Sequence, residues 1–542
     1  MRLTLLKIPT ILLTTLLIAS HAIADSNPVC DQTTNTQLVI HDVFNLNEKD
    51  TLFIHSWANF LHVKTKKRTL INEAAFFLKK CEINELDLDE LERHLRSKKY
   101  IRNASVKSVD DSVTIETWDN WSLLPTLDLS RKGGKNKFAF GIKDRNLFGL
   151  GIDAEIEYFN SDQRTGYKFD TSIPLFLHQN IHADVTLSNN NDGTAKAFFL
   201  RKDLVSFDTQ NAYTIGFSHF NQVDTQYENG VISEQFSHQQ RYATLHWQWL
   251  DNNSVKDTLR FGVGFTSESH TFSPVDEERF MLPEGLSTDN LSVQHIPKDR
   301  EFNYPFVSIN YLQKDYIKLT NIHLINHIED FNFGWNIKAS IGTDLSNNGT
   351  APRLIWEAAI AKGFKFSENS FLFVNAEFEG ESYSKSNNSN RAVVTLTTEY
   401  FHKINPQWST YFKNTNQFSR NQFLDDPIVL GGDTGIRGFP LQFQHSKHNS
   451  QFTFEARYYP HINIYKLLEL GAAGFIDTGR AFSPTVKSET PRTWMTSIGV
   501  GARLYSTHSS ESRVIHFDII KPLSTNTHVN NIEFRITTKH SF

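Results

Sequence analysis

The stretch IEFRITTK, residues 532–539, alternates apolar and polar side chains from its first residue. Ile532, Phe534 and Ile536 are apolar, and the residues between them are charged or polar. Successive side chains of a β-strand point to opposite faces, so one face of this segment is apolar and the other is polar. We therefore predict a strand near the end of the chain that lies between an apolar medium and water.

The same alternation recurs from residue 119 to the end of the chain, for example at 152–158 and 515–519. A soluble sandwich also alternates, but here the polar face is rich in charge. The chain also ends on such a strand, and closing the sheet into a barrel removes its exposed edges. Hydrophobic residues make up 39% of the chain and aromatic residues 13%, as strands that face lipid on one side require. The pattern predicts a mainly β protein, a transmembrane antiparallel β-barrel of about 20 strands.

The N-terminus has the features of a secretory signal peptide. Arg2 and Lys7 supply positive charge, and the apolar run at 8–18 is too short to span a bilayer. The triplet AIA at 22–24 provides the small residues that signal peptidase needs. We predict a signal peptide at 1–24; an uncleaved N-terminal anchor is the alternative.

Secretion would place the two cysteines of the chain, Cys30 and Cys81, in an oxidising compartment. One disulfide between them would tie the N-terminal tail to the first domain. Two free thiols are the other interpretation, because the sequence carries no information on their distance. Both interpretations stay open at this point.

Residues 25–118 mix helical and strand patterns, unlike the rest of the mature chain. A strand at 38–40, a helix at 68–78, a second helix capped by Asp87 and a hairpin within 104–117 follow one another. The predicted order is strand, helix, helix, strand, strand. We therefore predict one small α+β domain ahead of the barrel.

The alternation stops at LGGDTGIRGF, residues 430–439, which is rich in glycine. An ordinary surface loop with a solvated arginine is one interpretation. Two later segments, FEAR around Glu455 and GFIDTG around Asp477, favour a different interpretation. The alternation in each segment places its acid on the polar inner face. A guanidinium binds a carboxylate through two parallel hydrogen bonds, so we predict Arg437 beside these acids inside the barrel. The loop positions of interest are Gly431, Gly432, Ile436, Arg437, Gly438 and Phe439.

These three motifs resemble the signature loop and the two acceptor strands of the BamA/TamA superfamily of outer-membrane assembly and translocation barrels. NLFGLG, residues 146–151, resembles the first periplasmic turn of that family. The element order of residues 36–118 resembles a single POTRA (polypeptide-transport-associated) domain, and Trp57–His62 with Glu92–Arg96 resembles single-POTRA members. The chain departs from well-studied members in its single domain and in the KKC triplet at 79–81 in place of a glycine. Their barrels have 16 strands, against the roughly 20 that the alternation indicates, so the predicted barrel has 16 to about 20 strands.

The resemblance implies a role in inserting proteins into, or translocating them across, the outer membrane of a Gram-negative bacterium. It implies that the domain at 25–118 is periplasmic and that the barrel occupies 119–542. The implied partners are outer-membrane lipid and an unfolded polypeptide client at the POTRA-like domain. Phe534 and Phe542 would form a C-terminal assembly signal. A passive pore and a lipid-handling barrel without a protein client are the alternatives.

The sequence argues against enzymes and nucleic-acid-binding proteins. It contains no Gly-x-Ser-x-Gly elbow, no His-Glu-x-x-His pair and no phosphate loop. The formal net charge is −5, and no basic run is present. We therefore predict no catalytic residue, no cofactor, no metal site and no nucleic-acid partner.

Overall fold

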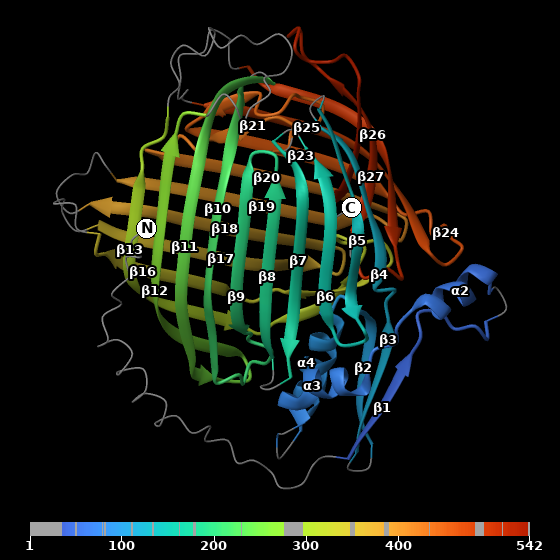
Figure 1. Cartoon of the computed structure of the whole chain (residues 1–542). Helices are drawn as coiled ribbons and strands as arrows, with labels where there is room; N and C mark the ends of the chain where they lie inside the picture. Colours follow the sequence, from blue (N-terminus) through green and yellow to red (C-terminus); the bar gives the residue numbers. More distant parts are fainter. Residues whose placement is uncertain are drawn as a thin grey trace.

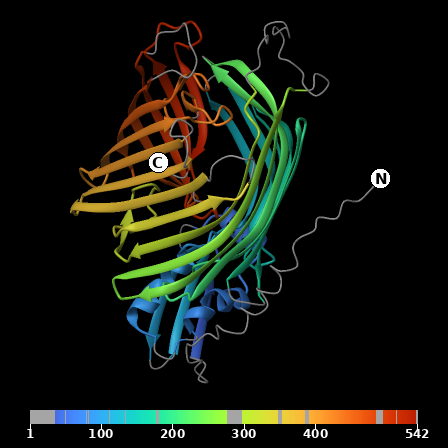
Figure 2. The ribbon, with the colours of Figure 1, turned by 90° about the vertical axis from the view of Figure 1, so that its left-hand side faces the viewer.

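The computed structural model describes residues 35–48, 51–78, 80, 83–109, 112–132, 135–161, 163–176, 180–228, 230–275, 296–346, 353–383, 390–432, 434–482, 493–511 and 513–539. The predicted signal peptide, Cys30, Cys81 and Phe542 lie outside these described residues. Along the described chain a small α+β domain precedes a large β-barrel (Figure 1). Figure 2, turned by 90°, shows the small domain at the same end of the barrel.

The N-terminal domain combines a three-stranded sheet with helices. Its elements are β1 (Asn35–His41), α2 (Phe53–Leu61), α3 (Lys67–Leu78), α4 (Glu85–Arg96), β2 (Ile101–Val109) and β3 (Ser112–Asp119). The strand order is β1-β3-β2, with β1 parallel and β2 antiparallel to β3. Leu70 and Phe77 of α3 and Leu95 of α4 are buried in one core with Ile115 of β3. Among the residues that the structure describes, no helix is long and apolar enough to cross a membrane.

Two helices of this domain differ from the sequence prediction. The prediction omitted α2, whose aromatic residues have low intrinsic helix propensity and which tertiary contacts such as His55 Nε2 to the Tyr465 carbonyl (2.7 Å) hold in place. The predicted N-cap Asp87 is also wrong, because α4 begins earlier, with Asn84 as its cap. The Asp87 amide donates to Asn84 Oδ1 (3.0 Å), and the Asn84 amide donates to Asp87 Oδ2 (3.1 Å). Asp87 is therefore the N3 residue of the capping box whose N-cap is Asn84.

The core of this domain also holds one buried carboxylate, Glu73 of α3. Its Oε2 lies 2.7 Å from Lys98 Nζ and 3.0 Å from His94 Nε2, and Tyr100 donates to its Oε1 (3.2 Å). Burial by itself would raise the pKa of Glu73, but Lys98 and His94 outweigh this effect and lower the pKa to about 2. Ionised Glu73 thus stabilises the folded domain at neutral pH.

Acidification is expected to remove this stabilisation. Because the folded pKa of Glu73 lies below its ordinary value of 4.5, the contribution is complete above pH 4.5 and is lost as the pH falls toward 2. Between pH 6 and pH 3 the loss is on the order of 2 kcal/mol, and it grows further toward pH 2. Hydrogen exchange of α3 and α4 in the full chain, corrected for intrinsic exchange rates, measures it between pH 6 and pH 3. The Glu73→Gln variant should show a smaller loss over this range; an equal loss would contradict the assignment.

The barrel is one antiparallel sheet of about 20 strands, as predicted. Each long strand pairs with its neighbours along the chain, so the sheet is an up-and-down meander (Figure 1). Its strands are β4 (Leu123–Lys132), β5 (Lys135–Leu147), β6 (Ile152–Asn160), β7 (Thr165–Leu175), β8 (Ile181–Asn190), β9 (Gly193–Lys202), β10 (Asn211–Glu228), β11 (Val231–Asn253), β12 (Asp257–Ser273), β13 (Arg300–Gln313), β16 (Asn336–Asp344), β17 (Arg353–Ser367), β18 (Ser370–Tyr383), β19 (Arg391–Lys403), β20 (Trp408–Arg420), β23 (His448–Tyr458), β24 (Asn463–Ile464), β25 (Leu468–Phe482), β26 (Met495–Ser506), β27 (Val514–Pro522) and β28 (Glu533–Lys539).

The two faces of this sheet differ as the alternation predicted. On the outer face apolar side chains are exposed, among them Phe454, Ile476 and Phe534. Charged side chains on the inner face are buried, and Asp518 and Arg535 are examples from β27 and β28. Because apolar side chains cover the outer face and charged side chains lie on the inner face, the outer face suits an apolar surround and the inner face suits a polar lumen.

The first and last strands of the barrel meet at a short seam. Within the described residues, β4 and β28 share one paired position, Ile536 opposite Arg131. The ladder between β10 and β11, by contrast, runs from Asn211 to Glu228. Among the described barrel ladders, the seam is therefore the one with the fewest paired positions.

Two connections between barrel strands carry strands of their own. The insert at 314–335, between β13 and β16, contains the hairpin β14 (Tyr316–Thr320) and β15 (Ile328–Asn332). The loop at 421–447, between β20 and β23, contains β21 (Ile428–Leu430) and β22 (Gln444–Ser446). We refer to them below as the insert and the motif loop. Both bring side chains to the inner face of the barrel.

Candidate functional site

The tip of the motif loop turns inward and is buried. Leu430, Ile436 and Phe439 have 1% or less of their surface exposed and pack together with residues of β25 and β26. The turn needs glycine, since Gly438 has φ of 87° and a Cβ there would lie 2.8 Å from Ile520. Gly431, Gly432 and Gly435 also have positive φ. The interpretation as an ordinary solvated surface loop is therefore wrong.

Arg437 at this tip lies between the two acids that the alternation singled out. Its Nε lies 2.6 Å from Asp477 Oδ2, and its Nη2 donates to Asp477 Oδ1 at 2.8 Å. The same Nη2 lies 3.1 Å from Glu455 Oε1. The side chains of Arg437, Asp477 and Glu455 are exposed by 3%, 0% and 5%. The structure thus brings all three together in a forked and almost fully buried arrangement.

Neighbouring groups complete this ionic cluster. The Phe475 ring lies against the guanidinium, with its centroid 3.4 Å from Arg437 Cζ. Thr453 donates to Asp477 Oδ1 (2.9 Å), and Arg457 Nε donates to Glu455 Oε2 (3.0 Å). Two buried arginines therefore face two buried carboxylates, so that each charge has a partner.

No protein-family model and no curated protein matches this chain. Among solved structures it is similar to CdiB from Escherichia coli, with 10% identity and a TM-score of 0.46 over 93% of this chain and 76% of that one. It is also similar to BamA from Haemophilus ducreyi lacking POTRA domains 1–3, with 11% identity and a TM-score of 0.42 over 94% and 84%. The FrpB iron transporter from Neisseria meningitidis (F5-1 variant, apoprotein form) has 7% identity and a TM-score of 0.42 over 80% and 84%. At these low scores the similarities decide neither family nor function.

The insert reaches across the barrel to the same ionic cluster. Its tip buries Ile322 against Phe371, Phe401 and Tyr411 of β18, β19 and β20. Arg457 Nη1 donates to the Ile322 carbonyl at 2.8 Å. Since the insert is rooted between β13 and β16, these contacts lay it across the mouth of the barrel that faces the N-terminal domain.

Further hydrogen bonds hold the insert tip in its compact form. The Glu329 carboxylate accepts from the backbone amides of Ile322, His323 and Leu324, at 3.1, 3.1 and 3.2 Å. Asn326 Nδ2 donates to Glu469 Oε2 of β25 (2.9 Å). The tip is therefore an ordered element rather than a solvated turn.

The N-terminal domain contacts the outer side of the insert through α4. Arg96 donates to Asp330 through Nε (3.2 Å) and Nη2 (3.0 Å). Lys318 Nζ lies 2.9 Å from Glu92 Oε1. A continuous set of contacts thus runs from α4 through the insert, Arg457 and the ionic cluster to the motif loop.

The sequence pattern predicted the ionic cluster but gave no sign of the insert. Arg457 could have been found, because the FEAR segment places it on the same face as Glu455. The tip NIHLIN, residues 321–326, has no such signal, since its contacts are with β18 to β25. Of the other predicted positions, Phe534 is exposed on the outer face.

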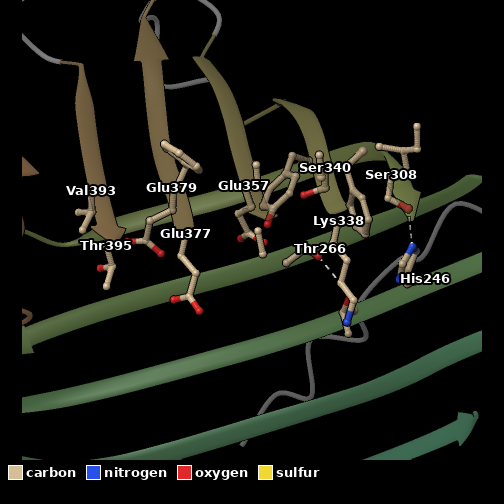
Figure 3. A pocket seen from close by; sticks show the side chains of 18 of the residues that line it. His246, Thr266, Ser308, Lys338, Ser340, Glu357, Glu377, Glu379, Val393 and Thr395 are labelled. Carbon is tan, nitrogen blue, oxygen red and sulfur yellow. Dashed lines mark hydrogen bonds between the residues drawn. The ribbon is translucent and has the colours of Figure 1, made fainter. Parts of the chain in front are cut away.

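The remaining lumen contains a cavity of about 720 Å³ next to the motif loop. Glu357 and Glu379 lie side by side on β17 and β18, with Glu377 below them (Figure 3). Lys338 of β16 and His246 of β11 also line the cavity. The cavity is therefore polar and mostly acidic, and its volume lies within the usual range of ligand-sized pockets.

Proposed function

We propose that this chain handles polypeptide at the outer membrane as a barrel of the BamA/TamA kind. In this proposal 1–24 is a signal peptide, 25–118 a periplasmic POTRA-like domain and 119–542 the barrel. The contact of Arg437 with Asp477 and Glu455 carries the proposal, because it unites the three motifs of the resemblance in one buried site. The apolar outer face supports a lipid surround. The proposal includes no catalytic step and no cofactor.

The N-terminal sheet offers the client a place to bind. Its order β1-β3-β2 leaves β2 at an edge, where an unfolded segment adds by β-augmentation. From there the client reaches the barrel, whose seam between β4 and β28 is the natural place for a lateral opening. Phe534 and Phe542 remain proposed as the assembly signal of the barrel itself.

A passive pore is the second candidate, and the insert argues against it. The insert and the motif loop both lie inside the barrel and are tied to each other through Arg457 and Glu455. A passive pore has no need for an ordered segment across its mouth. We therefore favour a barrel that is closed in the absence of a client and opens when a client passes.

A deletion strain distinguishes the candidates. We expect the loss of the protein to reduce one or a few specific proteins of the outer membrane or medium, and expression of wild type, but not Arg437→Ala, to restore them. Quantitative proteomics of both fractions measures this outcome. An unchanged proteome with altered surface lipid would favour a lipid-handling barrel. An unchanged proteome with altered solute uptake would favour the pore.

The proposed location predicts a heat-modifiable protein. A closed barrel resists unfolding in detergent until it is heated, because every strand is paired on both sides. The mature chain should therefore fractionate with outer membranes and change its electrophoretic mobility after boiling. Recovery from the periplasm as a soluble protein, with one mobility before and after boiling, would contradict the location.

A further inference from the structure

Two histidines face each other on neighbouring strands, away from the ionic cluster. His238 of β11 and His270 of β12 are both buried, and His238 Nε2 lies 2.9 Å from His270 Nδ1. Asp425 of the motif loop presents a carboxylate oxygen to them. The three ligand atoms all lie within 4.8 Å of one another.

The outer nitrogens of both rings are bound to carboxylates. His238 Nδ1 lies 2.6 Å from Asp224 Oδ2, and His270 Nε2 lies 2.9 Å from Glu268 Oε1. An ionised carboxylate can only accept, so both outer nitrogens donate. A neutral imidazole carries one N–H. His238 Nε2 and His270 Nδ1 therefore carry no proton, and their lone pairs point at each other. Such a contact needs a cation between or beside the nitrogens, either a proton or a metal ion.

We propose that His238, His270 and Asp425 bind a transition-metal cation of the zinc type. Imidazole nitrogen and carboxylate oxygen are the ligands that zinc prefers, and three protein ligands leave a fourth position for water. Metal-binding histidines commonly donate their other N–H to a carboxylate, as both rings do here. His238, His270 and Asp425 would thus contact the metal, and Asp224 and Glu268 would orient the two imidazole rings.

The proposed site also explains the position of Asp425. Its carboxylate accepts a forked contact from Arg300, at 2.9 and 2.8 Å, and still has lone pairs for a metal. Donor atoms of a tetrahedral zinc site are about 3.4 Å apart, so binding would draw Asp425 toward the rings. Because Asp425 belongs to the motif loop, the metal would fasten this loop to β11 and β12.

The sequence pattern predicted no metal site. The two histidines are 32 residues apart and belong to no spacing motif. Only the register of β11 against β12 brings them together, since His270 pairs with Gln240, two residues from His238.

Zinc binding to the purified full chain tests this site. After treatment with a chelator, added ZnCl₂ should bind once per chain, measured by elemental analysis after gel filtration, and should raise the unfolding temperature. MgCl₂ should do neither. We expect His270→Gln to abolish binding and Glu268→Gln, which changes only the orientation of the ring, to weaken it by about 10- to 100-fold. His246→Ala is the matched control, because His246 is a lumenal histidine that contacts Ser308 instead.

Two results would overturn the proposal. One is the absence of retained zinc in the wild-type chain. The other is equal retention in wild type and His270→Gln, which would place the metal elsewhere.

A second inference concerns α2, which exposes an aromatic face. Phe53 and Phe60 are each exposed by 84%, and Trp57 by 51%. On the other side of the helix His55 is buried and binds the Tyr465 carbonyl of the barrel, while the half-exposed Trp57 ring meets the edge of Trp121. Figure 1 shows α2 beyond the barrel wall, next to β24.

We infer that this face lies in the lipid headgroup region beside the barrel. Tyr465 and Ile462, in the turn that α2 contacts, are also exposed and extend the apolar outer face toward the helix. Tryptophan and tyrosine favour this interface. The exposed lysines at 64, 66 and 67 follow the helix at once and would attract anionic headgroups. The inference rests on the proposed membrane location of the barrel.

Quenching of tryptophan by brominated lipid tests α2 in proteoliposomes. Lipids brominated near the headgroup should quench wild type more than Trp57→Phe, and the difference is the fluorescence of Trp57. Trp494→Phe, which removes an exposed tryptophan of the loop before β26, is the control for general quenching. Identical quenched fractions in wild type and Trp57→Phe would overturn the inference. A chain that never becomes heat-modifiable in the liposomes would instead count against the membrane location.

Discussion

The replacement of Arg437 by alanine is expected to lower the free energy of unfolding of the barrel by about 3–5 kcal/mol. The guanidinium is buried and bound in a fork to Asp477, with Glu455 as a second partner. Its removal would take from Asp477 its forked partner within a buried site, whereas Glu455 would keep Arg457. An exposed ion pair, by contrast, contributes about 0–1 kcal/mol. Thermal unfolding followed by electrophoretic mobility measures the difference.

Three further variants give this prediction its controls. Thr434→Ala removes a bond within the same loop, from Thr434 Oγ1 to the Gly431 carbonyl, and should have a small effect. Arg437→Lys should retain only part of the free energy of unfolding that alanine loses, because an ammonium group cannot form the forked contact. In a double-mutant cycle the effects of Arg437→Ala and Asp477→Ala should be far from additive. Simple additivity would mean that the two side chains do not interact.

Removal of the insert tip is expected to open the barrel. Replacing residues 321–327 with a glycine–serine stretch of equal length eliminates the contacts of Ile322 with β18 to β20 and its bond to Arg457. Since these contacts lay the tip across the mouth of the barrel, we expect a several-fold higher single-channel conductance in planar bilayers. Cells that produce the variant should also become sensitive to large hydrophilic antibiotics.

The matched control replaces Glu368 and Asn369, in the turn that connects β17 to β18 at the same end of the barrel, by glycine and serine. The Glu368 side chain is exposed by 88% and lies 2.6 Å from Lys365 of β17. This replacement should leave conductance unchanged. Equal conductance of the two variants and wild type would show that the insert does not restrict the lumen.

The ionic cluster was predictable from sequence because it depends on a local rule. Side chains of a strand alternate between faces, so Glu455 and Asp477 had to share the inner face of two consecutive strands. Consecutive strands of a meander are also neighbours, which brings the two acids close without any knowledge of the whole barrel. Arg437 followed from the glycine-rich interruption just before the first of these strands.

Other features depend on pairings that no local pattern contains. The partners of Ile322 come from strands far along the sheet, and those of α2 come from a turn near the opposite end of the chain. Asp425 meets His238 and His270 only because the motif loop folds into the lumen. The cap of α4 at Asn84 was a smaller miss, since Asp87 is equally suited to a cap and the capping box uses both.

The sequence by itself therefore determined the class of the protein: a barrel with an apolar outer and a charged inner face, a small α+β domain before it, and one inward loop that bears Arg437. These features follow from side-chain periodicity, which has a range of a few residues. Only the tertiary structure decided that the insert crosses the mouth, that the seam rests on Ile536 opposite Arg131, and that two histidines meet carboxylates at one place. The physical reason is that closure of the sheet brings together inward side chains from strands distant in sequence, and their register is a property of the whole ring.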